Sequence, residues 1–266
     1  EALRRRRQRA PQGPRRAVGV AGLCGGGDVP AGAAARPPCA NDDAARLLDD
    51  PRGRRGSFTG SARVGWMIRQ RAPMKRVLLE LGGNAAVIIE PDADLDHAVR
   101  RCVFGGYTYA GQSCISTQRI LVHEQIYDRF VERFVPAVAA LRTGDPLLDT
   151  TDVGPMIDQA NAERAAAWIA EAVKGGARLA AGGGRTGAIL EPTVLLDTAS
   201  GMRVNCEEIF APVTTVRRYA DFEAAIATVN DYPFGLQAGL FSNDMRLIFR
   251  AWALVDVGGL LINDVP

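Results

Sequence analysis

Cys114 and Glu80 are the two residues of this chain whose types and surroundings best suit covalent chemistry. Cys114 lies in the run Gly-Gln-Ser-Cys-Ile-Ser, where small neighbours leave a sulfur accessible to a substrate. Glu80 lies earlier, in Leu-Glu-Leu-Gly-Gly-Asn, where a carboxylate can take a proton from water. A thiolate is a strong nucleophile near neutral pH, so the pair suits nucleophilic catalysis with a general base. Free cysteines are often buried and inert, so without further evidence Cys114 and Glu80 can also be interpreted as structural residues.

The other cysteines and the histidines exclude several further kinds of site. The two histidines, His97 and His123, lie far in sequence from any Ser or Cys motif, which argues against a Cys-His or Ser-His-Asp hydrolase. No Cys-x-x-Cys pair occurs, so we expect reduced thiols in a cytoplasmic protein, with neither disulfides nor a metal site. Of the remaining cysteines, we expect Cys102 and Cys206 to be packing residues.

Composition limits the partners that this chain can have. The 266 residues are 47% hydrophobic and carry a net charge of +2, and no run approaches the ~18 apolar residues of a membrane span. Arginines concentrate in residues 1–46, a segment rich in Arg, Gly, Pro and Ala that lacks the apolar surface to offset its ordering entropy. We therefore expect that segment to be disordered and the protein to bind neither nucleic acid nor membrane. A basic arm that binds nucleic acid is the alternative interpretation.

The segments that must position Cys114 and Glu80 alternate between strand and helix patterns. We expect strands at residues 77–81, 85–89, 119–122, 213–219, 238–242 and 258–263. We expect helices at residues 94–104, 125–141, 160–174, 221–229 and 244–254. This alternation predicts an α/β fold with a parallel sheet. Glu80 would then lie on a strand, and Cys114 would lie in the loop before the strand at 119–122.

Several further runs occur in a fixed order around these two residues. They are Phe58-Thr59-Gly60-Ser61, Glu207-Glu208-Ile209-Phe210-Ala211-Pro212-Val213, Asn230-Asp231-Tyr232-Pro233-Phe234-Gly235 and Gly258-Gly259-Leu260-Leu261-Ile262-Asn263. Together with the Glu-Leu-Gly-Gly and Gly-Gln-x-Cys runs, they resemble the aldehyde dehydrogenase superfamily over about residues 47–266. Six runs in a fixed order rarely arise by chance.

The resemblance implies a domain organisation. Residues 47–82 would be the end of a Rossmann-like dinucleotide-binding domain, and residues 83–266 a catalytic domain that is incomplete at its C-terminus. Residues 1–46 match no part of the family pattern. Because the chain has roughly half the usual family length, we expect a fragment truncated at both ends.

The resemblance also implies a reaction and a site. Cys114 would attack an aldehyde to form a thiohemiacetal, hydride loss to NAD or NADP would leave a thioester, and Glu80 would activate the water that hydrolyses it. The implied cofactor-binding residues are Gly60, Ser61, Leu81, Gly82, Glu208 and Phe210. Full-length relatives would be homo-oligomers that act on small aldehydes. Two alternatives are an inactive fragment that keeps the fold and a cofactor-independent thiol esterase.

Overall fold

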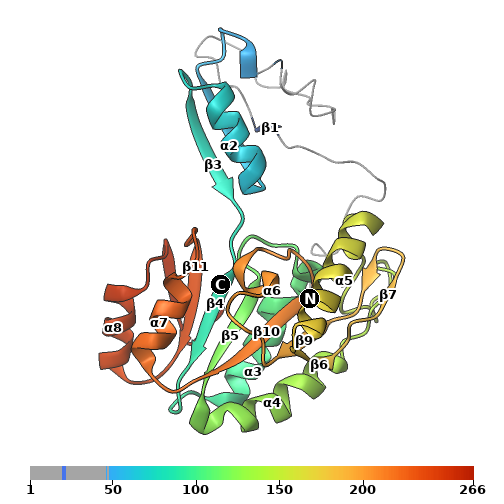
Figure 1. Ribbon diagram of the computed structural model, residues 1–266, viewed down its shortest axis with the longest axis vertical. Coiled ribbons are helices and arrows are strands. Elements are labelled where there is room, and N and C mark those ends of the chain that lie inside the picture. Colours follow the sequence, from blue (N-terminus) through green and yellow to red (C-terminus); the bar gives the residue numbers. More distant parts are fainter. Residues whose placement is uncertain (1–19, 22–45, 47) are drawn as a thin grey trace. The chain divides into compact units, whose positions relative to one another are not determined.

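The structure, a computed structural model, describes residues 20–21, 46 and 48–266 (Figure 1). Its backbone divides between Gly82 and Gly83 into a smaller unit, which ends at Gly82, and a larger unit, which runs to Pro266. In the described part of the chain, no helix is both long and apolar enough to cross a membrane. The expectation of disorder for residues 1–46 falls outside the described residues, apart from three positions.

The smaller unit is a strand–helix–strand motif with one added strand. Its elements are β1 (Val20–Ala21), β2 (Arg55–Gly60), α2 (Ala62–Arg71) and β3 (Arg76–Leu81). β2 and β3 are parallel, and β1 pairs with β2 in the antiparallel sense. Side chains alternate along β3, so Leu79 and Leu81 are partly buried whereas Glu80 is exposed. α2 lies close to β3 because Gly65 has no side chain: a Cβ there would lie 2.5 Å from Leu81 Cδ2.

The larger unit contains a seven-stranded sheet with the order β12-β11-β4-β5-β10-β9-β6 (Figure 1). Its strands are β4 (Ala85–Ile89), β5 (Thr117–His123), β6 (Arg178–Ala181), β9 (Thr193–Leu196), β10 (Val213–Tyr219), β11 (Gln237–Phe241) and β12 (Gly259–Ile262). All neighbouring strands are parallel except β6, which is antiparallel to β9. A short hairpin of β7 (Arg185–Thr186) and β8 (Ile189–Leu190) lies outside this sheet.

Helices connect the strands and cover both faces of the sheet (Figure 1). They are α3 (Leu95–Tyr107), the short 3-10 helix η1 (Thr108–Gly111), α4 (Glu124–Ala139), α5 (Gln159–Lys174), α6 (Arg203–Cys206), α7 (Phe222–Asn230) and α8 (Met245–Leu254). The fold is therefore the predicted α/β class with a mainly parallel sheet.

The central strand β4 shows how the core is divided. All of its residues are buried, and alternate side chains enter two different clusters. Val87 and Ile89 pack with α3 and α4, whereas Ala86 and Ile88 pack with α7 and α8. A parallel strand covered on both faces needs an uninterrupted apolar run, and this sequence supplies one.

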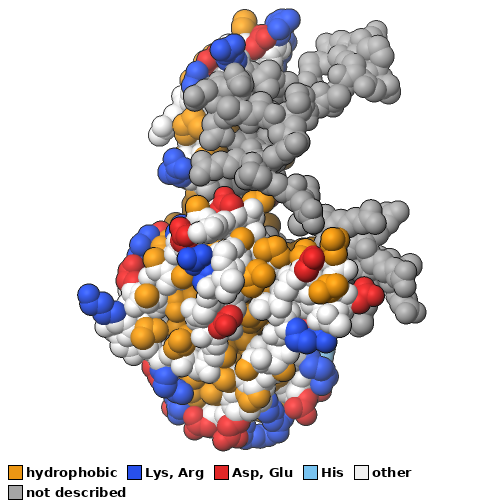
Figure 2. Space-filling model, turned by 90° about the vertical axis from the view of Figure 1, so that its right-hand side faces the viewer, with side chains coloured by type: hydrophobic (Ala, Val, Ile, Leu, Met, Phe, Trp, Pro, Cys, Tyr) orange, Lys and Arg blue, Asp and Glu red, His pale blue; other side chains and the backbone are white. Residues whose placement is uncertain are grey.

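A third cluster and the surface complete the larger unit. Trp168 and Ile169 of α5 pack with Leu195 of β9, with Val213 at the start of β10 and with Ile209 in the loop before it. On the face shown in Figure 2, acidic and basic side chains of the larger unit are interspersed.

Candidate active site

Three segments of the larger unit meet at the edge of the sheet where the parallel strands begin. Gly83 precedes β4, Cys114 precedes β5, and Glu208 lies in the loop that leads into β10. β4, β5 and β10 are parallel neighbours, so the loops before them lie at one edge. The candidate site is thus built from loops on a rigid sheet.

The backbone before Cys114 makes an unusual turn. Tyr109, Ala110 and Gly111 are consecutive and left-handed, with φ of 55°, 54° and 65°. Gly111 also contacts the Glu208 loop directly, because a Cβ built on it would lie 2.0 Å from the carbonyl oxygen of Ala211. Only glycine combines this φ with such a close backbone approach. The turn therefore fixes the Cys114 loop against the loop that carries Glu208.

Hydrogen bonds hold the rest of the Cys114 loop. Gln112 accepts a hydrogen bond at Oε1 from the Ile157 N–H (2.9 Å), and its Nε2 donates to the Tyr109 carbonyl (3.3 Å). The Ser116 N–H donates to the Ser113 carbonyl at 3.0 Å. Within this frame Cys114 is half-buried and its thiol is free.

The other described cysteines have different surroundings. Cys102 is fully buried among apolar side chains, and burial raises the pKa of its thiol, so it is the packing residue that we expected. Cys206 is exposed, and its thiol donates to the carbonyl of Ser200 at 2.9 Å. The prediction that Cys206 is a packing residue was wrong, because Cys206 lies exposed at the end of the short helix α6.

The Glu208 side chain and the Cys114 backbone both contact Gly83. Glu208 Oε1 accepts a hydrogen bond from the Gly83 N–H at 3.1 Å, and a Cβ on Gly83 would lie 3.1 Å from the carbonyl oxygen of Cys114. Burial raises the pKa of Glu208, while the Gly83 N–H and the charge of Arg164 oppose that rise. The structure therefore brings the Cys114 backbone and the Glu208 side chain together at Gly83.

Phe210 lies in a strained position of the Glu208 loop. Its φ is 51°, and its ring is 37% exposed, whereas the adjacent Ile209 and Ala211 are buried. A left-handed conformation is uncommon for a bulky residue and persists only where neighbouring contacts hold it. Here the buried neighbours hold the backbone, so the ring stays accessible to a ligand.

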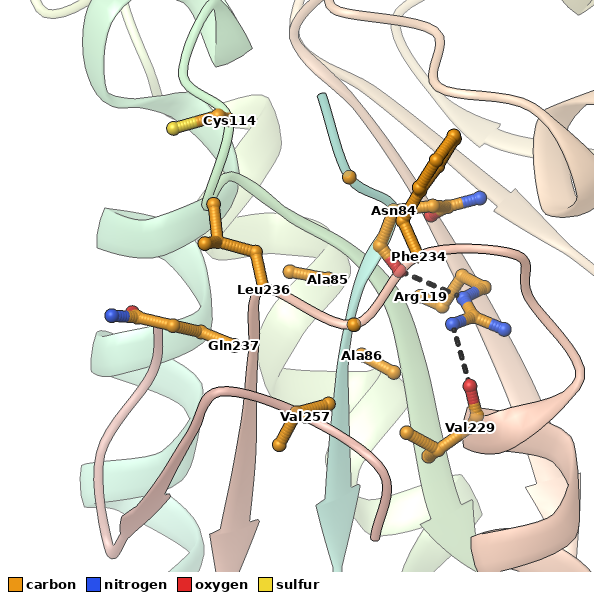
Figure 3. A pocket seen from close by; sticks show the side chains of 12 residues that line it. Asn84, Ala85, Ala86, Cys114, Arg119, Val229, Phe234, Leu236, Gln237 and Val257 are labelled. Carbon is orange, nitrogen blue, oxygen red and sulfur yellow. Dashed lines mark hydrogen bonds between the residues drawn. The ribbon is translucent and has the colours of Figure 1, made fainter. Parts of the chain in front are cut away.

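A small crevice runs from Cys114 along the start of β4 (Figure 3). Cys114 lies at one end, with its side chain directed away from Arg119. The Arg119 guanidinium donates to the carbonyls of Asn84 (3.1 Å), Thr228 (2.9 Å) and Val229 (3.3 Å). Burial lowers the pKa of Arg119 to about 10. Arg119 thus ties the beginning of β4 to the end of α7.

The remaining predicted site residues belong to the smaller unit. Thr59 pairs with Glu80 and Gly60 pairs with Leu81 in the β2–β3 ladder, and Gly82 follows directly. Ser61 is the N-cap of α2, but its side chain makes no capping hydrogen bond. Its carbonyl accepts from the Gly65 N–H at 3.0 Å. That Glu80 acts together with Cys114 in one site stays a prediction.

Two arginines of this region were not among the predicted site residues. Arg119 gives a signal in the sequence, because it is a charged residue directly before the apolar run Ile120-Leu121-Val122 of the same strand. Arg164 gives none, since it resembles any polar residue of an amphipathic helix. Across the described residues, no group of three or more His, Cys, Asp or Glu side chains is arranged to hold a metal ion.

Comparison with known proteins identifies the family. The Aldehyde dehydrogenase family profile matches residues 9–266, which extends the similarity well before the motif-based start at residue 47. A curated 3-sulfolactaldehyde dehydrogenase from Priestia aryabhattai is 43% identical over 208 residues, which are 78% of this chain and 44% of that protein.

Solved structures of aldehyde dehydrogenases support the same family assignment. Aldehyde dehydrogenase 21 from Physcomitrella patens, in complex with the reaction product succinate, is 42% identical with a TM-score of 0.83, over 86% of this chain and 48% of that one. Glyceraldehyde-3-phosphate dehydrogenase from Methanocaldococcus jannaschii, complexed with NADP, is 36% identical with a TM-score of 0.81, over 84% and 48% of the two chains. This chain spans about half the length of these relatives. It belongs to the NAD(P)-dependent aldehyde dehydrogenase family.

Proposed function

We propose that this chain supplies the nucleophile and part of the cofactor site of an enzyme that oxidises a small aldehyde to a carboxylic acid. The observation that supports this most directly is the meeting of the Cys114 loop, Gly83 and Glu208 at one sheet edge. Relatives act on 3-sulfolactaldehyde or were solved with succinate, so an aldehyde with an anionic tail is the substrate class we favour.

Cys114 performs the covalent steps in this proposal. Its thiolate adds to the carbonyl carbon of the aldehyde, and the C=O π electrons move to oxygen, which gives a thiohemiacetal oxyanion. The Cys114 backbone N–H is one donor that can stabilise this oxyanion. Collapse of the oxyanion expels a hydride from the same carbon and leaves a thioester on the sulfur.

NAD or NADP, when bound, supplies the acceptor for that hydride. The chemistry of the described residues fits a nicotinamide dinucleotide. Among them, Gly83 makes the only hydrogen bond to the Glu208 carboxylate, at Oε1, so Oε2 is left to accept from a ribose hydroxyl. The accessible Phe210 ring would pack near the nicotinamide. In the smaller unit, the strand–turn–helix at Gly60 and Ser61 would receive the phosphates, with Leu81 and Gly82 nearby.

Glu80 would complete the reaction as the general base. It would take a proton from the water that attacks the thioester, and the thiolate of Cys114 would leave as the carboxylic acid forms. Its exposed position on β3 leaves the carboxylate without a hydrogen-bond or ion-pair partner among the described residues.

The decisive experiment follows both the thiol and the hydride. The chain is mixed with succinate semialdehyde and with NAD or NADP, and intact-mass and peptide mass spectrometry are combined with absorbance of the reduced nicotinamide. We expect an acyl adduct on Cys114 that requires both cofactor and aldehyde, and that is absent in Cys114→Ala.

The other outcomes each support a different function. Turnover of p-nitrophenyl acetate without cofactor, combined with no acyl adduct from the aldehyde, would replace the proposal with a thiol esterase. An unmodified Cys114 in both reactions would mean that the chain keeps the family fold without its catalysis.

A further inference from the structure

A cationic cluster supports the Glu208 loop from the side of α5 and α6. Trp168 of α5 is buried, and the guanidinium carbons of two arginines lie over its ring. Arg164 lies 5.0 Å from the ring centroid and Arg203 lies 4.3 Å from it. Such cation–π contacts hold a guanidinium group in place without neutralising its charge.

The two arginines differ in their charged partners. Arg203 is exposed and forms ion pairs with Glu171 (3.3 Å) and Glu207 (3.2 Å). Arg164 is half-buried and forms no ion pair with any described residue. Instead, its Nη2 donates to the carbonyl of Ile209 at 2.7 Å. Arg203 is thus neutralised by its neighbours, whereas the charge of Arg164 remains available to the loop.

The hydrogen bond from Arg164 acts where the loop is strained. The Ile209 carbonyl belongs to the peptide bond between Ile209 and the left-handed Phe210. A conformation of that kind is strained and needs contacts that hold it. Arg164 supplies one such contact, from a helix rather than from the loop itself.

We propose that Arg164 is a positioning residue, which holds the Ile209 carbonyl by hydrogen bond and the Glu208 carboxylate by charge. Glu208 thereby stays directed toward Gly83 and remains an anion that can accept from a ribose hydroxyl. This inference rests on the proposed role of Glu208 in cofactor binding.

The charges around Glu208 agree with this assignment. Burial raises the pKa of Glu208, and Arg164 is the one charged side chain that opposes the rise. Burial in turn lowers the pKa of Arg164, and Arg203 adds to that effect, while Glu208, Glu207 and Asp158 oppose it. Tyr232 also interacts with Glu208, but its ordinary pKa already lies well above 7 and burial raises it to about 12, so it is neutral near pH 7. Arg164 is therefore the charged side chain that favours the ionised form of Glu208.

The test measures the ionisation of Glu208 directly and without cofactor. The chain is labelled with carbon-13 at the glutamate carboxyl carbons, and the Glu208 signal is assigned from its loss in Glu208→Gln. Arg164→Gln keeps a donor for the Ile209 carbonyl but removes the charge. We expect the pKa of Glu208 to rise by about one unit in this variant, as for loss of a nearby opposite charge.

Two further variants separate charge from packing. Arg164→Lys keeps the cation and should leave the pKa of Glu208 closer to its native value than Arg164→Gln does. Arg203→Gln is the matched control, because it removes the other guanidinium from the same Trp168 ring; it should shift the Glu208 pKa far less. An unchanged Glu208 pKa in Arg164→Gln, or an equal shift in Arg203→Gln, would overturn the proposal.

Calorimetric titration with NADP and NAD then connects the inference to function. We expect binding by the native chain to weaken about threefold in Arg164→Gln at a pH midway between the two Glu208 pKa values, because the ionised fraction of Glu208 falls by about that factor when its pKa rises by one unit. If the Glu208 pKa shifts as expected but the native chain binds neither nucleotide, Arg164 still positions Glu208 and the proposed function fails.

Discussion

Residues of the candidate site have both a chemical role and a structural role. Gly83 donates to Glu208 and lies against the Cys114 carbonyl, and Gly111 forms the turn before Cys114 and contacts Ala211. The sequence motifs identify the chemical roles from residue type alone. They do not identify the contacts, because Gly83 and Glu208 are distant in sequence and come together only when the strands that follow them are placed in one sheet. Arg164 has no motif and becomes visible only through its contacts.

Cys114 should be the most reactive described thiol at neutral pH. It is half-buried in a loop, whereas Cys102 is completely buried and its pKa is raised by burial. The S–H of the exposed Cys206 is engaged in a hydrogen bond to the Ser200 carbonyl. Limited iodoacetamide labelling with peptide mass spectrometry should therefore give the rate order Cys114, Cys206, Cys102. Faster labelling of Cys102 in folded protein would argue against Cys114 as the nucleophile.

Gly111→Ala should destabilise the chain strongly. The new Cβ would meet the Ala211 carbonyl oxygen at 2.0 Å, in addition to the strain of a positive φ. We expect a loss of about 3 kcal/mol or more in the free energy of unfolding, measured by urea denaturation. Gly187→Ala is the control, because Gly187 has a φ of 58° but no atom within 4 Å of the added Cβ. Equal losses in the two variants would mean that strain alone, without the contact, explains the effect.

The long secondary-structure elements of the larger unit were predicted well, and its short ones were not. β4 and β10 have the predicted bounds, and Asp94, Asp221 and Asp244, predicted as first helix residues, are N-caps whose side chains accept backbone N–H groups. The prediction omitted β6, β9 and α6, because four residues carry too little periodicity. No sequence pattern predicts the antiparallel pairing of β6 with β9. These short strands form because the neighbouring strands of the sheet supply their hydrogen-bond partners.

Glu90, a buried carboxyl group at the carboxyl end of the sheet, should make the free energy of unfolding depend on pH. Glu90, after β4, is 6% exposed and accepts from the hydroxyl of Tyr219, at the end of β10. Burial raises its pKa above the ordinary 4.5; Tyr219 and His123 oppose the rise, while Asp92 and Asp244 add to it. The folded state therefore binds more protons than the unfolded state, and Glu90 makes stability fall as pH rises from 4.5 through the folded-state pKa.

Glu90→Gln should remove this dependence. The amide keeps an acceptor for Tyr219 but carries no charge, so the variant should be more stable than the native chain near pH 7 and similar to it below the ordinary pKa. Urea denaturation across this pH range measures the difference. Tyr219→Phe is the companion variant, which should lower stability near neutral pH because it leaves the buried carboxylate without its donor. A native chain that gains stability with pH in this window would contradict the assignment.

At the scale of the whole molecule, the chain divides into two units, and the apolar clusters of the described residues lie in the larger one. All three apolar clusters draw their residues from 85–265, so the larger unit buries its core without help from the smaller one. We expect residues 83–266 produced alone to unfold in one cooperative transition, as monitored by near- and far-UV circular dichroism. Coincident loss of both signals is the expected result. A gradual transition with strong binding of an apolar dye would show that the smaller unit is required for packing.

The order of the seven strands has a consequence for the growing chain on the ribosome. β4 and β5 are adjacent in the sheet and are made first, but their outer neighbours β11 and β10 come much later in the sequence. At roughly 5–20 residues per second, both edges of this apolar pair remain uncovered for several seconds of synthesis. Unpaired strand edges attract other chains. Chaperones that act on nascent chains, or slower initiation at low temperature, should therefore raise the soluble yield while leaving the melting temperature unchanged.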